Sequence, residues 1–172
     1  INIGLSSSSP SWLGDVVELH RHLILVSSNE GDIEKAVTMF RRAGYDSIYG
    51  YSIGITDWVL SGEEVGFLPQ ISIHALKNIL SKYDDHALID VRTVEEWDEG
   101  HIEGAFHVPI HDILEDGLEE YAEKDAHISI ICRSGYRSNI AASFLKSKGY
   151  RHIYSVIGGM LTWQKEYEVI FD

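Results

Sequence analysis

The sequence contains a single cysteine, Cys132, and two arginines, Arg133 and Arg137, follow it by one and five positions. The cysteine stands directly after residues 128–131, an apolar run suited to a buried parallel strand. A helical pattern begins a few residues later. A thiol between such a strand and a helix meets the positive end of the helix dipole, which favours the nucleophilic thiolate. Because arginine stays charged at physiological pH, the pattern predicts a cysteine nucleophile that attracts a small anion.

The loop after the cysteine could hold that anion through its backbone. Gly135 permits a tight turn, and a loop wound into a helix start directs backbone N–H groups inward. We therefore expect the backbone of residues 134–138 to stabilise the bound group. The residues assigned to substrate binding are Arg133, Ser134, Gly135, Tyr136, Arg137 and Ser138.

Asp90 and Arg92 follow a second apolar run, residues 87–90. Open parallel sheets bind their ligands at the carboxyl ends of the strands, where Cys132 also lies. We expect both residues to support the site. Either could reach it, but the preferred interpretation is an ion pair or hydrogen bond that braces neighbouring loops.

The second half of the chain alternates apolar runs with helical patterns. Thr93 and Glu96 have the spacing of a capping box and predict the start of a short helix. This alternation predicts an α/β fold, a parallel sheet covered by helices on both faces. We expect strands at residues 71–73, 87–90, 106–108, 128–131 and 153–156, and longer helices at residues 75–83, 113–122 and 141–148.

The chain also contains an internal repeat. Shifted by 105 residues, the first part aligns with the second without a gap, so that Gly44 meets Gly149. Agreement through loops as well as apolar runs favours a duplication. Residues 71–105 have no counterpart, which makes the first copy incomplete. Two domains are expected: an incomplete, degenerate copy at residues 1–67 and an active copy at residues 68–172.

At the position of Cys132 the first copy has Ser27, and Ser28 and Asp32 replace the two arginines. A serine hydroxyl stays protonated at neutral pH, and a carboxylate repels an anion. The first copy is therefore expected to be inactive and to have a structural role. Its apolar run at residues 23–26 predicts a buried strand. The side chains expected to pack in a core include Trp58, Trp97 and Trp163.

Five stretches within residues 71–165 agree with one known family in order and spacing: residues 88–92, 95–97, 100–105, 132–138 and 158–163. Together they resemble the rhodaneses, and residues 132–138 resemble the active loop of the single-domain type. The resemblance implies a five-stranded parallel sheet and a sulfurtransferase. It implies that Cys132 accepts a sulfane sulfur from thiosulfate or a small persulfide and passes it to a thiol or cyanide in a ping-pong reaction. No cofactor is implied besides the persulfide on Cys132.

A degenerate copy before an active one is also the order found in fusions with a metallo-β-lactamase-like persulfide dioxygenase. The chain is similar to the tail of such a fusion, and its first residue, Ile1, agrees with a fragment. The partners expected besides the substrates are a missing domain of that kind or a second copy, either of which would cover the first repeat.

Two alternative functions remain open. Related folds hydrolyse phosphate esters from a Cys-x5-Arg loop, but here the arginine comes one residue earlier and Ser138 takes its position. The shorter loop suits one sulfur atom better than a phosphoryl group. The other alternative is a binding or scaffold module without catalysis.

Composition excludes several other classes. The 172 residues carry a net charge of −13, which argues against nucleic-acid binding. No apolar run approaches the ~18 residues of a membrane span. A single cysteine cannot form an intrachain disulfide, which favours the cytoplasm. The histidines at 101, 107 and 111 lack the spacing of a closed metal site. The acidic residues between 112 and 125 are expected on the solvated face of a helix.

Overall fold

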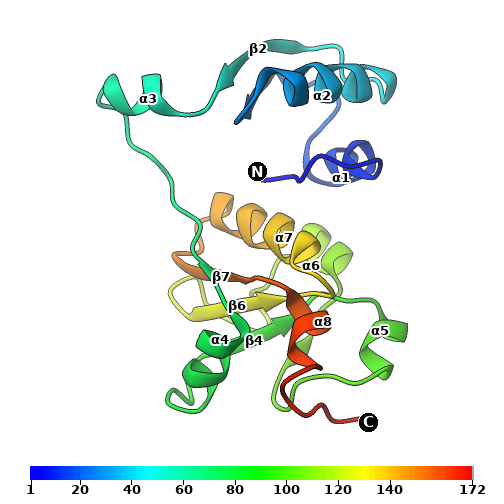
Figure 1. Ribbon diagram of the computed structural model, residues 1–172, viewed down its shortest axis with the longest axis vertical. Helices are drawn as coiled ribbons and strands as arrows, with labels where there is room; N and C mark the ends of the chain where they lie inside the picture. The colour runs from blue at the N-terminus through cyan, green and yellow to red at the C-terminus, as the bar shows by residue number, and fades with distance from the viewer. Residues whose placement is uncertain (172) are drawn as a thin grey trace. The chain divides into compact units, whose positions relative to one another are not determined.

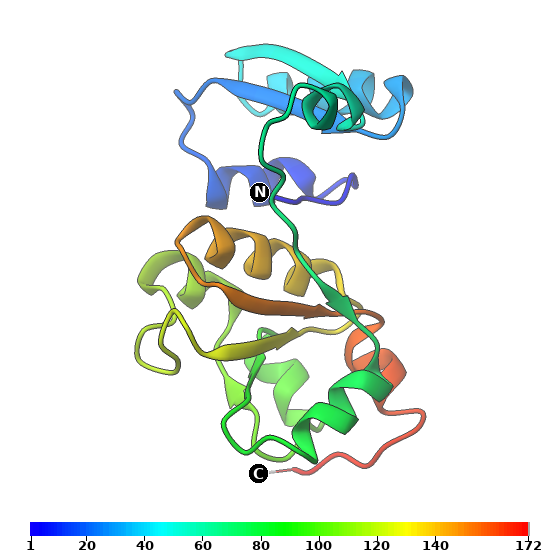
Figure 2. The same cartoon turned by 90° about the vertical axis from the view of Figure 1, so that its left-hand side faces the viewer.

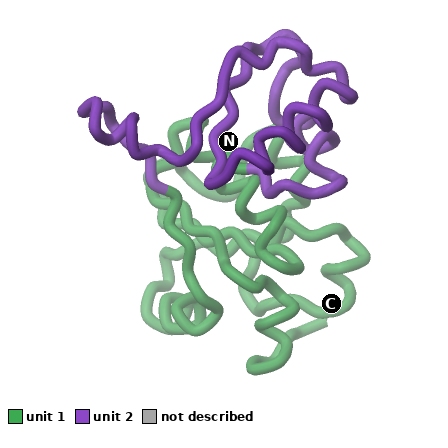
Figure 3. The backbone as a smooth tube through the Cα atoms, turned by 45° about the horizontal axis from the view of Figure 1, so that its top comes forward, with its two compact units in different colours: residues 1–2, 68–172 green, residues 3–67 purple. Residues whose placement is uncertain are grey.

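The computed structural model describes residues 1–171. Their contacts divide into two compact units (Figure 3). The amino-terminal unit is residues 3–67, and the carboxyl-terminal unit is residues 68–172 together with residues 1–2. Each unit has its own sheet.

The carboxyl-terminal unit contains a five-stranded sheet in the order β3-β7-β6-β4-β5, and every neighbouring pair is parallel (Figure 1). The predicted parallel α/β fold is therefore confirmed. The strands are β3 (Gln70–Ile71), β4 (Ala87–Asp90), β5 (Phe106–His107), β6 (His127–Ile131) and β7 (His152–Val156).

Helices cover both faces of this sheet, α6 and α7 on one side and α4 and α8 on the other (Figures 1 and 2). The core on the second side joins Leu76 of α4 and Trp163 of α8 to Ile131 and Val156 of the central strands. The helices are α4 (Ile73–Leu80), α5 (Val94–Asp98), α6 (Ile110–Asp116), α7 (Tyr136–Ser147) and α8 (Gly159–Trp163).

Capping residues move two of the predicted boundaries. The Ser72 side chain accepts a hydrogen bond from the Ala75 N–H, so Ile73 opens a helix and does not end a strand. Helix α6 begins at Ile110 and stops before Gly117, whose φ of 83° a helix cannot accommodate. The prediction of one acidic helix through residue 125 is therefore wrong, although its carboxylates are exposed.

The amino-terminal unit is smaller. Its parallel strands β1 and β2 are joined through α2, and Leu13, Ala36, Phe40 and Tyr45 form its buried core. The Tyr45 hydroxyl donates to the Val17 carbonyl at 2.5 Å and ties α1 to this core. The elements are α1 (Ser9–Val16), β1 (Leu23–Ser27), α2 (Glu30–Arg42), β2 (Ile48–Ile53) and α3 (Thr56–Leu60).

Two predictions for this unit are wrong. Strand β1 is not buried on both faces, because Ile24 is 72% exposed and Val26 is 56% exposed. The apolar run indicated burial, but the helices of this unit cover only one face of the two strands. Trp58 is 56% exposed, whereas Trp97 and Trp163 are buried as expected.

Across residues 1–171, no helix combines the length and the apolar character needed to span a lipid bilayer.

Candidate active site

Cys132 lies at the carboxyl edge of the five-stranded sheet, directly after β6. The residues from Arg133 to Gly135 form the turn, and α7 begins at Tyr136. Strand β4 ends beside it, because the Val91 N–H donates to the carbonyl of Ile131 at 2.9 Å. The thiol is therefore at the sheet edge where open α/β folds bind ligands.

The thiol lies within the loop and is 1% exposed. The Gly135 N–H donates to its Sγ at 3.1 Å, and Sγ lies 3.6 Å from the Ser138 hydroxyl. That hydroxyl donates to the Gly135 carbonyl at 3.1 Å and also lies 3.1 Å from Ser155 Oγ. Cys132 thus has a backbone donor on one side and a buried polar pair behind it. Charge on the sulfur would be stabilised by the Gly135 N–H, whereas the Ser138 hydroxyl donates its proton to the Gly135 carbonyl.

Two glycines make this geometry possible. Gly135 caps α7 with a φ of 100°, a conformation that other residues adopt only with strain. At Gly159, a Cβ atom would lie 2.2 Å from the carbonyl oxygen of Cys132. Because no side chain stands there, the N–H groups of Met160 and Leu161 donate to the carbonyls of Cys132 and Arg133 at 2.8 and 2.9 Å. The start of α8 therefore fixes the orientation of the loop peptides.

The two arginines beside the thiol meet a carboxylate. Arg137 Nη2 donates to both carboxylate oxygens of Glu96, at 2.8 and 2.6 Å. Arg133 Nη1 lies 3.7 Å from the same carboxylate. The sequence predicted positive charge beside the thiol, and the structure adds a carboxylate to it: Glu96 pairs with both arginines and offsets one of their two charges. The side chain of Arg133 remains 58% exposed to solvent.

Glu96 is held as a carboxylate by this arrangement. Burial acts to raise its pKa, but hydrogen bonds from Arg137 and the Thr93 N–H, together with the charges of Arg137 and Arg133, produce a net lowering. The Thr93 bond is half of the predicted capping box, which the structure confirms. Sequence reasoning assigned Glu96 only to that box and missed its contact with the thiol loop.

Asp90 and Arg92 form the expected brace. Their side chains are almost fully buried and pair at 2.8 Å. The Arg92 guanidinium also donates to the carbonyls of Glu96 and Gly100, the latter at 2.9 Å. These contacts hold α5, and with it the Glu96 carboxylate, against the end of β4. Arg92, which pairs with Asp90, is therefore connected through Glu96 to Arg137 of the loop that contains Cys132.

The remaining loop residues differ in exposure. Ser134 is exposed, Tyr136 and Arg137 are half-buried, and Ser138 is buried. All seven residues from 132 to 138 therefore belong to one continuous loop and helix start, with only part of it open to solvent.

Among residues 1–171, no group of three or more histidine, cysteine or acidic side chains is arranged to hold a metal ion. Two of the histidines considered above pack instead. The rings of His101 and His107 stack on Trp97, with centroids 3.6 and 4.7 Å away.

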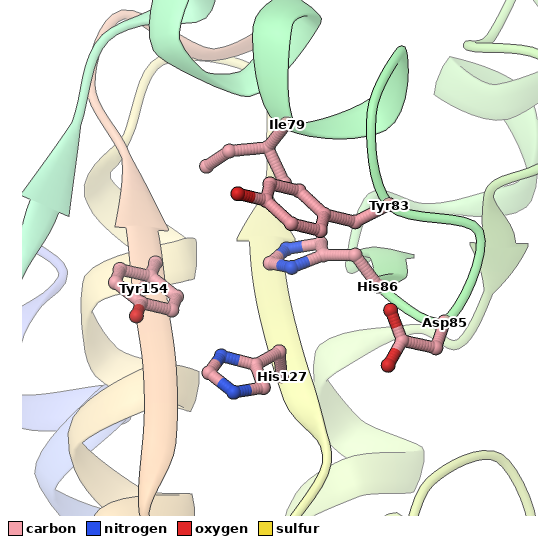
Figure 4. Close-up of a pocket in the computed structure, with 6 residues that line it drawn as sticks. All are labelled: Ile79, Tyr83, Asp85, His86, His127 and Tyr154. Carbon is pink, nitrogen blue, oxygen red and sulfur yellow. The ribbon is translucent and has the colours of Figure 1, made fainter.

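A cavity of about 460 Å³ lies at the opposite end of the strands, near the starts of β4 and β6 (Figure 4). Here His86 Nε2 lies 2.8 Å from the hydroxyl of buried Ser129. Burial and the nearby His127 lower the pKa of His86, against an opposing effect of Asp85. None of residues 132–138 lines this cavity, so it is separate from the loop that contains Cys132. Its lining residues are Ile79, Tyr83, Asp85, His86, His127 and Tyr154.

Several curated proteins are similar to the carboxyl-terminal part of the chain. The putative sulfurtransferase YtwF of Bacillus subtilis is 38% identical over 99 residues, which cover 58% of this chain and 93% of YtwF. Thiosulfate sulfurtransferase GlpE of Coxiella burnetii is 33% identical over 85 residues, covering 49% of this chain and 78% of GlpE. The putative sulfur carrier protein YrkF of Bacillus subtilis is 36% identical over 103 residues, or 60% of this chain. The match spans only 55% of the length of YrkF.

Solved structures give the same result for the fold. A rhodanese-like domain protein from Staphylococcus aureus is 30% identical, with a TM-score of 0.55, covering 61% of this chain and 99% of that one. A rhodanese-related protein from Thermoplasma volcanium is 28% identical, with a TM-score of 0.53, covering 60% and 99%. The family described as "Rhodanese-like domain" matches residues 72–166. This match contains the whole thiol loop, α5 with Glu96 and the start of α8, and the chain belongs to the rhodanese family.

Proposed function

We propose that residues 68–172 transfer a sulfane sulfur from thiosulfate or a low-molecular-weight persulfide to a thiol or cyanide, through a persulfide on Cys132. One observation carries the proposal: the Gly135 N–H donates to Sγ at 3.1 Å at the start of α7. A backbone donor and a helix dipole directed at one sulfur favour a thiolate and then a persulfide anion.

The reaction balances without an added oxidant or reductant. The Cys132 thiolate attacks the outer sulfur of thiosulfate, a sulfur–sulfur bond forms, and the sulfur–sulfur bond of thiosulfate breaks. Sulfite leaves with the bonding electron pair. Cyanide or a thiolate then attacks the outer sulfur of the persulfide, and the Cys132 thiolate is released. This ping-pong course needs no cofactor beyond the persulfide itself.

The burial of the thiol favours a narrow donor. At 1% exposure, Sγ can meet a terminal sulfur atom more easily than a bulky ester. Arg133, which is exposed, is assigned to attract the anion. Arg137 is assigned to orient the anion after the anion has replaced Glu96 as its partner. The backbone of residues 134–138 is assigned to hold the transferred sulfur.

The names of the relatives support the same reaction class. YtwF is named a putative sulfurtransferase, GlpE a thiosulfate sulfurtransferase, and YrkF a putative sulfur carrier. The geometry gives less support to a phosphatase, because Ser138 stands at the position of the phosphatase arginine and is buried behind the thiol.

The remaining parts of the proposal concern the setting of this domain. Residues 1–67 are proposed to be a degenerate copy with Ser27 in place of the cysteine, and the protein is proposed to act in the cytoplasm. The order of the two copies supports a natural fusion to a metallo-β-lactamase-like domain, or else a homo-oligomer that covers the first copy.

Mass spectrometry of the intact chain tests the reaction. After treatment with thiosulfate or glutathione persulfide, wild type is expected to gain ~32 Da on its sole thiol and to release it on addition of cyanide. Cys132→Ser is the matched control and should gain nothing. If wild type neither gains this mass nor forms thiocyanate with thiosulfate, glutathione persulfide or polysulfide, the enzyme proposal is wrong and the scaffold alternative stands. Phosphate-ester hydrolysis above the Cys132→Ser background would instead favour the phosphatase.

A further inference from the structure

The cavity at the amino ends of β4 and β6 takes no part in the proposed sulfur transfer. Its volume of about 460 Å³ lies within the range of small-molecule sites. Aromatic and imidazole rings form most of its lining, together with one aliphatic side chain and one carboxylate. The rings are those of Tyr83, His86, His127 and Tyr154, and the other two side chains are Ile79 and Asp85 (Figure 4).

Strand geometry places two of these rings on the same face of the sheet. Side chains alternate along a strand, so His127, Ser129 and Ile131 of β6 share one face. The register sets Ser129 beside Tyr154 of β7, and Tyr154 therefore lies on that face too. At the carboxyl end this face is the aliphatic core under α4 and α8, to which Ile131 belongs. At the amino end the same face carries an imidazole and a phenol in place of aliphatic side chains.

The rings stand around the cavity at an angle to one another. The His86 ring centroid lies 6.1 Å from that of Tyr154 and 6.3 Å from that of His127, with the planes tilted by 39° and 34°. In Figure 4, Tyr154 lies across from Tyr83 and His86. His152 stacks on His127 at 4.5 Å and supports it from outside the lining. Tilted rings at these distances leave part of each face open, and the negative potential of a ring face attracts cations.

The His86 ring is held in place and uncharged. Its Nε2 lies 2.8 Å from the hydroxyl of Ser129, which is fully buried, so the sheet orients the ring. Burial and the nearby His127 lower the pKa of His86 below its ordinary value, against an opposing effect of Asp85. The ring is therefore neutral at pH 7 and does not repel a cation.

The charge of the lining is negative. Asp85 contributes a carboxylate, and neither a lysine nor an arginine lines the cavity. Across residues 1–171, Asp85 forms no ion pair with a lysine or arginine side chain. The whole chain carries a net charge of −13. An anion would meet an unfavourable potential here, whereas a cation is favoured both by Asp85 and by the field of the chain.

The polar groups narrow the class of cation. A primary ammonium group has three N–H donors, and each of them needs an acceptor. The Ser129 hydroxyl and His86 Nε2 already lie within hydrogen-bond distance of each other, and Ile79 offers only aliphatic contact. An ammonium group whose hydrogens are replaced by methyl groups needs no acceptor and is bound through aromatic faces.

We infer that this cavity binds a small, freely diffusing organic cation with an alkylated ammonium group. The faces of Tyr83, His86 and Tyr154 are assigned to the methyl groups, and Asp85 is assigned to the charge. Tyr83 is 57% exposed, and Asp85 and His127 are exposed too, so the cavity opens to solvent on that side. The inference concerns a site separate from Cys132 and is independent of the proposed function.

Choline is the probe for this site. Its matched control is the dimethylbutanol in which a carbon atom replaces the charged nitrogen, so that shape is kept and charge is lost. Nuclear magnetic resonance of the ¹⁵N-labelled full chain at pH 7.5 follows the backbone amides during each titration. Choline is expected to cause saturable shifts at residues 83–86, 127–129 and 154, and none at residues 132–138. The neutral control should bind at least about tenfold more weakly.

Two pairs of variants separate the carboxylate from the ring. Asp85→Asn should weaken choline binding about threefold and leave dimethylbutanol binding unchanged. Asp98→Asn removes an exposed carboxylate from α5, outside the lining, and should change neither. Tyr83→Leu should also weaken choline binding about threefold, whereas Tyr83→Phe keeps the ring and should bind as wild type does. Tyr121→Leu removes an exposed tyrosine outside the cavity and is the control for Tyr83→Leu.

The spectra of the variants also show whether each keeps its fold, because the amides outside the cavity should not move. The inference is overturned if choline causes no saturable shift at the lining, or if dimethylbutanol binds as tightly as choline. It is also overturned if Asp85→Asn and Asp98→Asn behave alike.

A lipid headgroup carries the same cation, so phosphatidylcholine vesicles form a further arm of the test. The chain should stay in solution when such vesicles are sedimented. Co-sedimentation that choline reverses would assign the cavity to a lipid surface and overturn the inference of a free ligand. None of these readouts uses Cys132, so their failure leaves the proposed function untouched.

Discussion

The loop from β1 to α2 and the loop from β6 to α7 connect a parallel strand to a helix in the same way, yet they use the start of the helix differently. In the first, the Asn29 side chain accepts the Asp32 N–H at 2.9 Å and caps α2. In the second, Gly135 caps α7 without a side chain, and its own N–H donates to Cys132 Sγ. A side-chain cap satisfies backbone donors that a glycine cap leaves for a ligand.

The layer behind each loop differs as well. Ser138 and Ser155 place two hydroxyls 3.1 Å apart beneath the thiol. By the 105-residue offset their counterparts are Ile33, a buried core residue, and Gly50. The first loop therefore lacks both the cysteine and the two hydroxyls behind it, and its cap occupies the N–H of Asp32. Restoring any one of them should not restore chemistry.

The largest effect is expected from exchanging the nucleophile. Cys132→Ser, which places the Ser27 side chain type at this position, should lower thiocyanate formation by at least about 10³-fold, because a hydroxyl is a much weaker nucleophile than the proposed sulfur nucleophile. Steady-state turnover with thiosulfate and cyanide measures this loss.

The reverse exchange sharpens the comparison. In a Ser27→Cys/Cys132→Ser double variant, the only thiol lies in the first loop, beside Glu30 and Asp32. No ~32 Da adduct and no turnover above the Cys132→Ser background are expected. Turnover in the double variant would show that the surrounding loop matters less than the thiol.

The next largest effect is expected at Arg137. Arg137→Asp reproduces Asp32 and places a second carboxylate beside Glu96, so kcat/KM for thiosulfate should fall by roughly 100-fold. Arg137→Lys keeps the charge but loses the planar guanidinium, so kcat/KM should fall by less than in Arg137→Asp. Equal losses in the two variants would contradict an electrostatic role.

A smaller change is expected from Glu96→Gln. The variant removes the charged partner of Arg137, so the arginine is available to the anion and KM for thiosulfate should fall. The arginine is then no longer held in position, so kcat should fall by about tenfold. An unchanged kcat would argue against positioning by Glu96.

The same variant has a signature in stability. The folded-state pKa of Glu96 is lowered, so its contribution to the free energy of unfolding is present above its unfolded pKa, about 4.3, and is lost as pH falls through the lower folded value. Urea unfolding at pH 6 and pH 3 should show wild type more stable than Glu96→Gln only at the higher pH.

The smallest effect is expected at the other end of the sheet. The pKa of His86 is lowered in the folded state, so folding is favoured above its unfolded value of about 6.5 and loses this contribution as pH falls below it. Between pH 7.5 and 5.5, wild type should lose more stability than His86→Gln. Persulfide formation by His86→Gln at pH 7.5 should stay within about twofold of wild type. A larger change would show that the two ends of the sheet are energetically coupled.

Local sequence patterns predicted the sheet and the loop because strands and helix starts depend mainly on residues close together in the sequence. Residues 128–131 are apolar and bounded by a loop, and Thr93 and Glu96 are spaced for a capping box. Such patterns place the strands and helix starts of an α/β unit.

The parts that local patterns did not predict depend on distant residues. Glu96 contacts Arg137, which follows it by 41 positions, and nothing near Glu96 signals this pair. The apolar run of β1 predicted a buried strand. A sequence shows how apolar a strand is, but it does not show whether a second layer covers that strand. Helix α6 ends before Gly117 because the positive φ of this glycine does not fit a helix, although acidic residues continue beyond it in the sequence.

The hydrogen bonds from Met160 and Leu161 to the loop that contains Cys132 have a practical consequence for experiments that isolate or transplant this loop. A fragment cut before Gly158 would retain the complete seven-residue signature from Cys132 to Ser138, and a search for that signature would count it as intact. It would nevertheless release the carbonyls of Cys132 and Arg133 that α8 restrains. A fragment that keeps these contacts must therefore include α8, and grafts of the signature alone onto other scaffolds should remain inert.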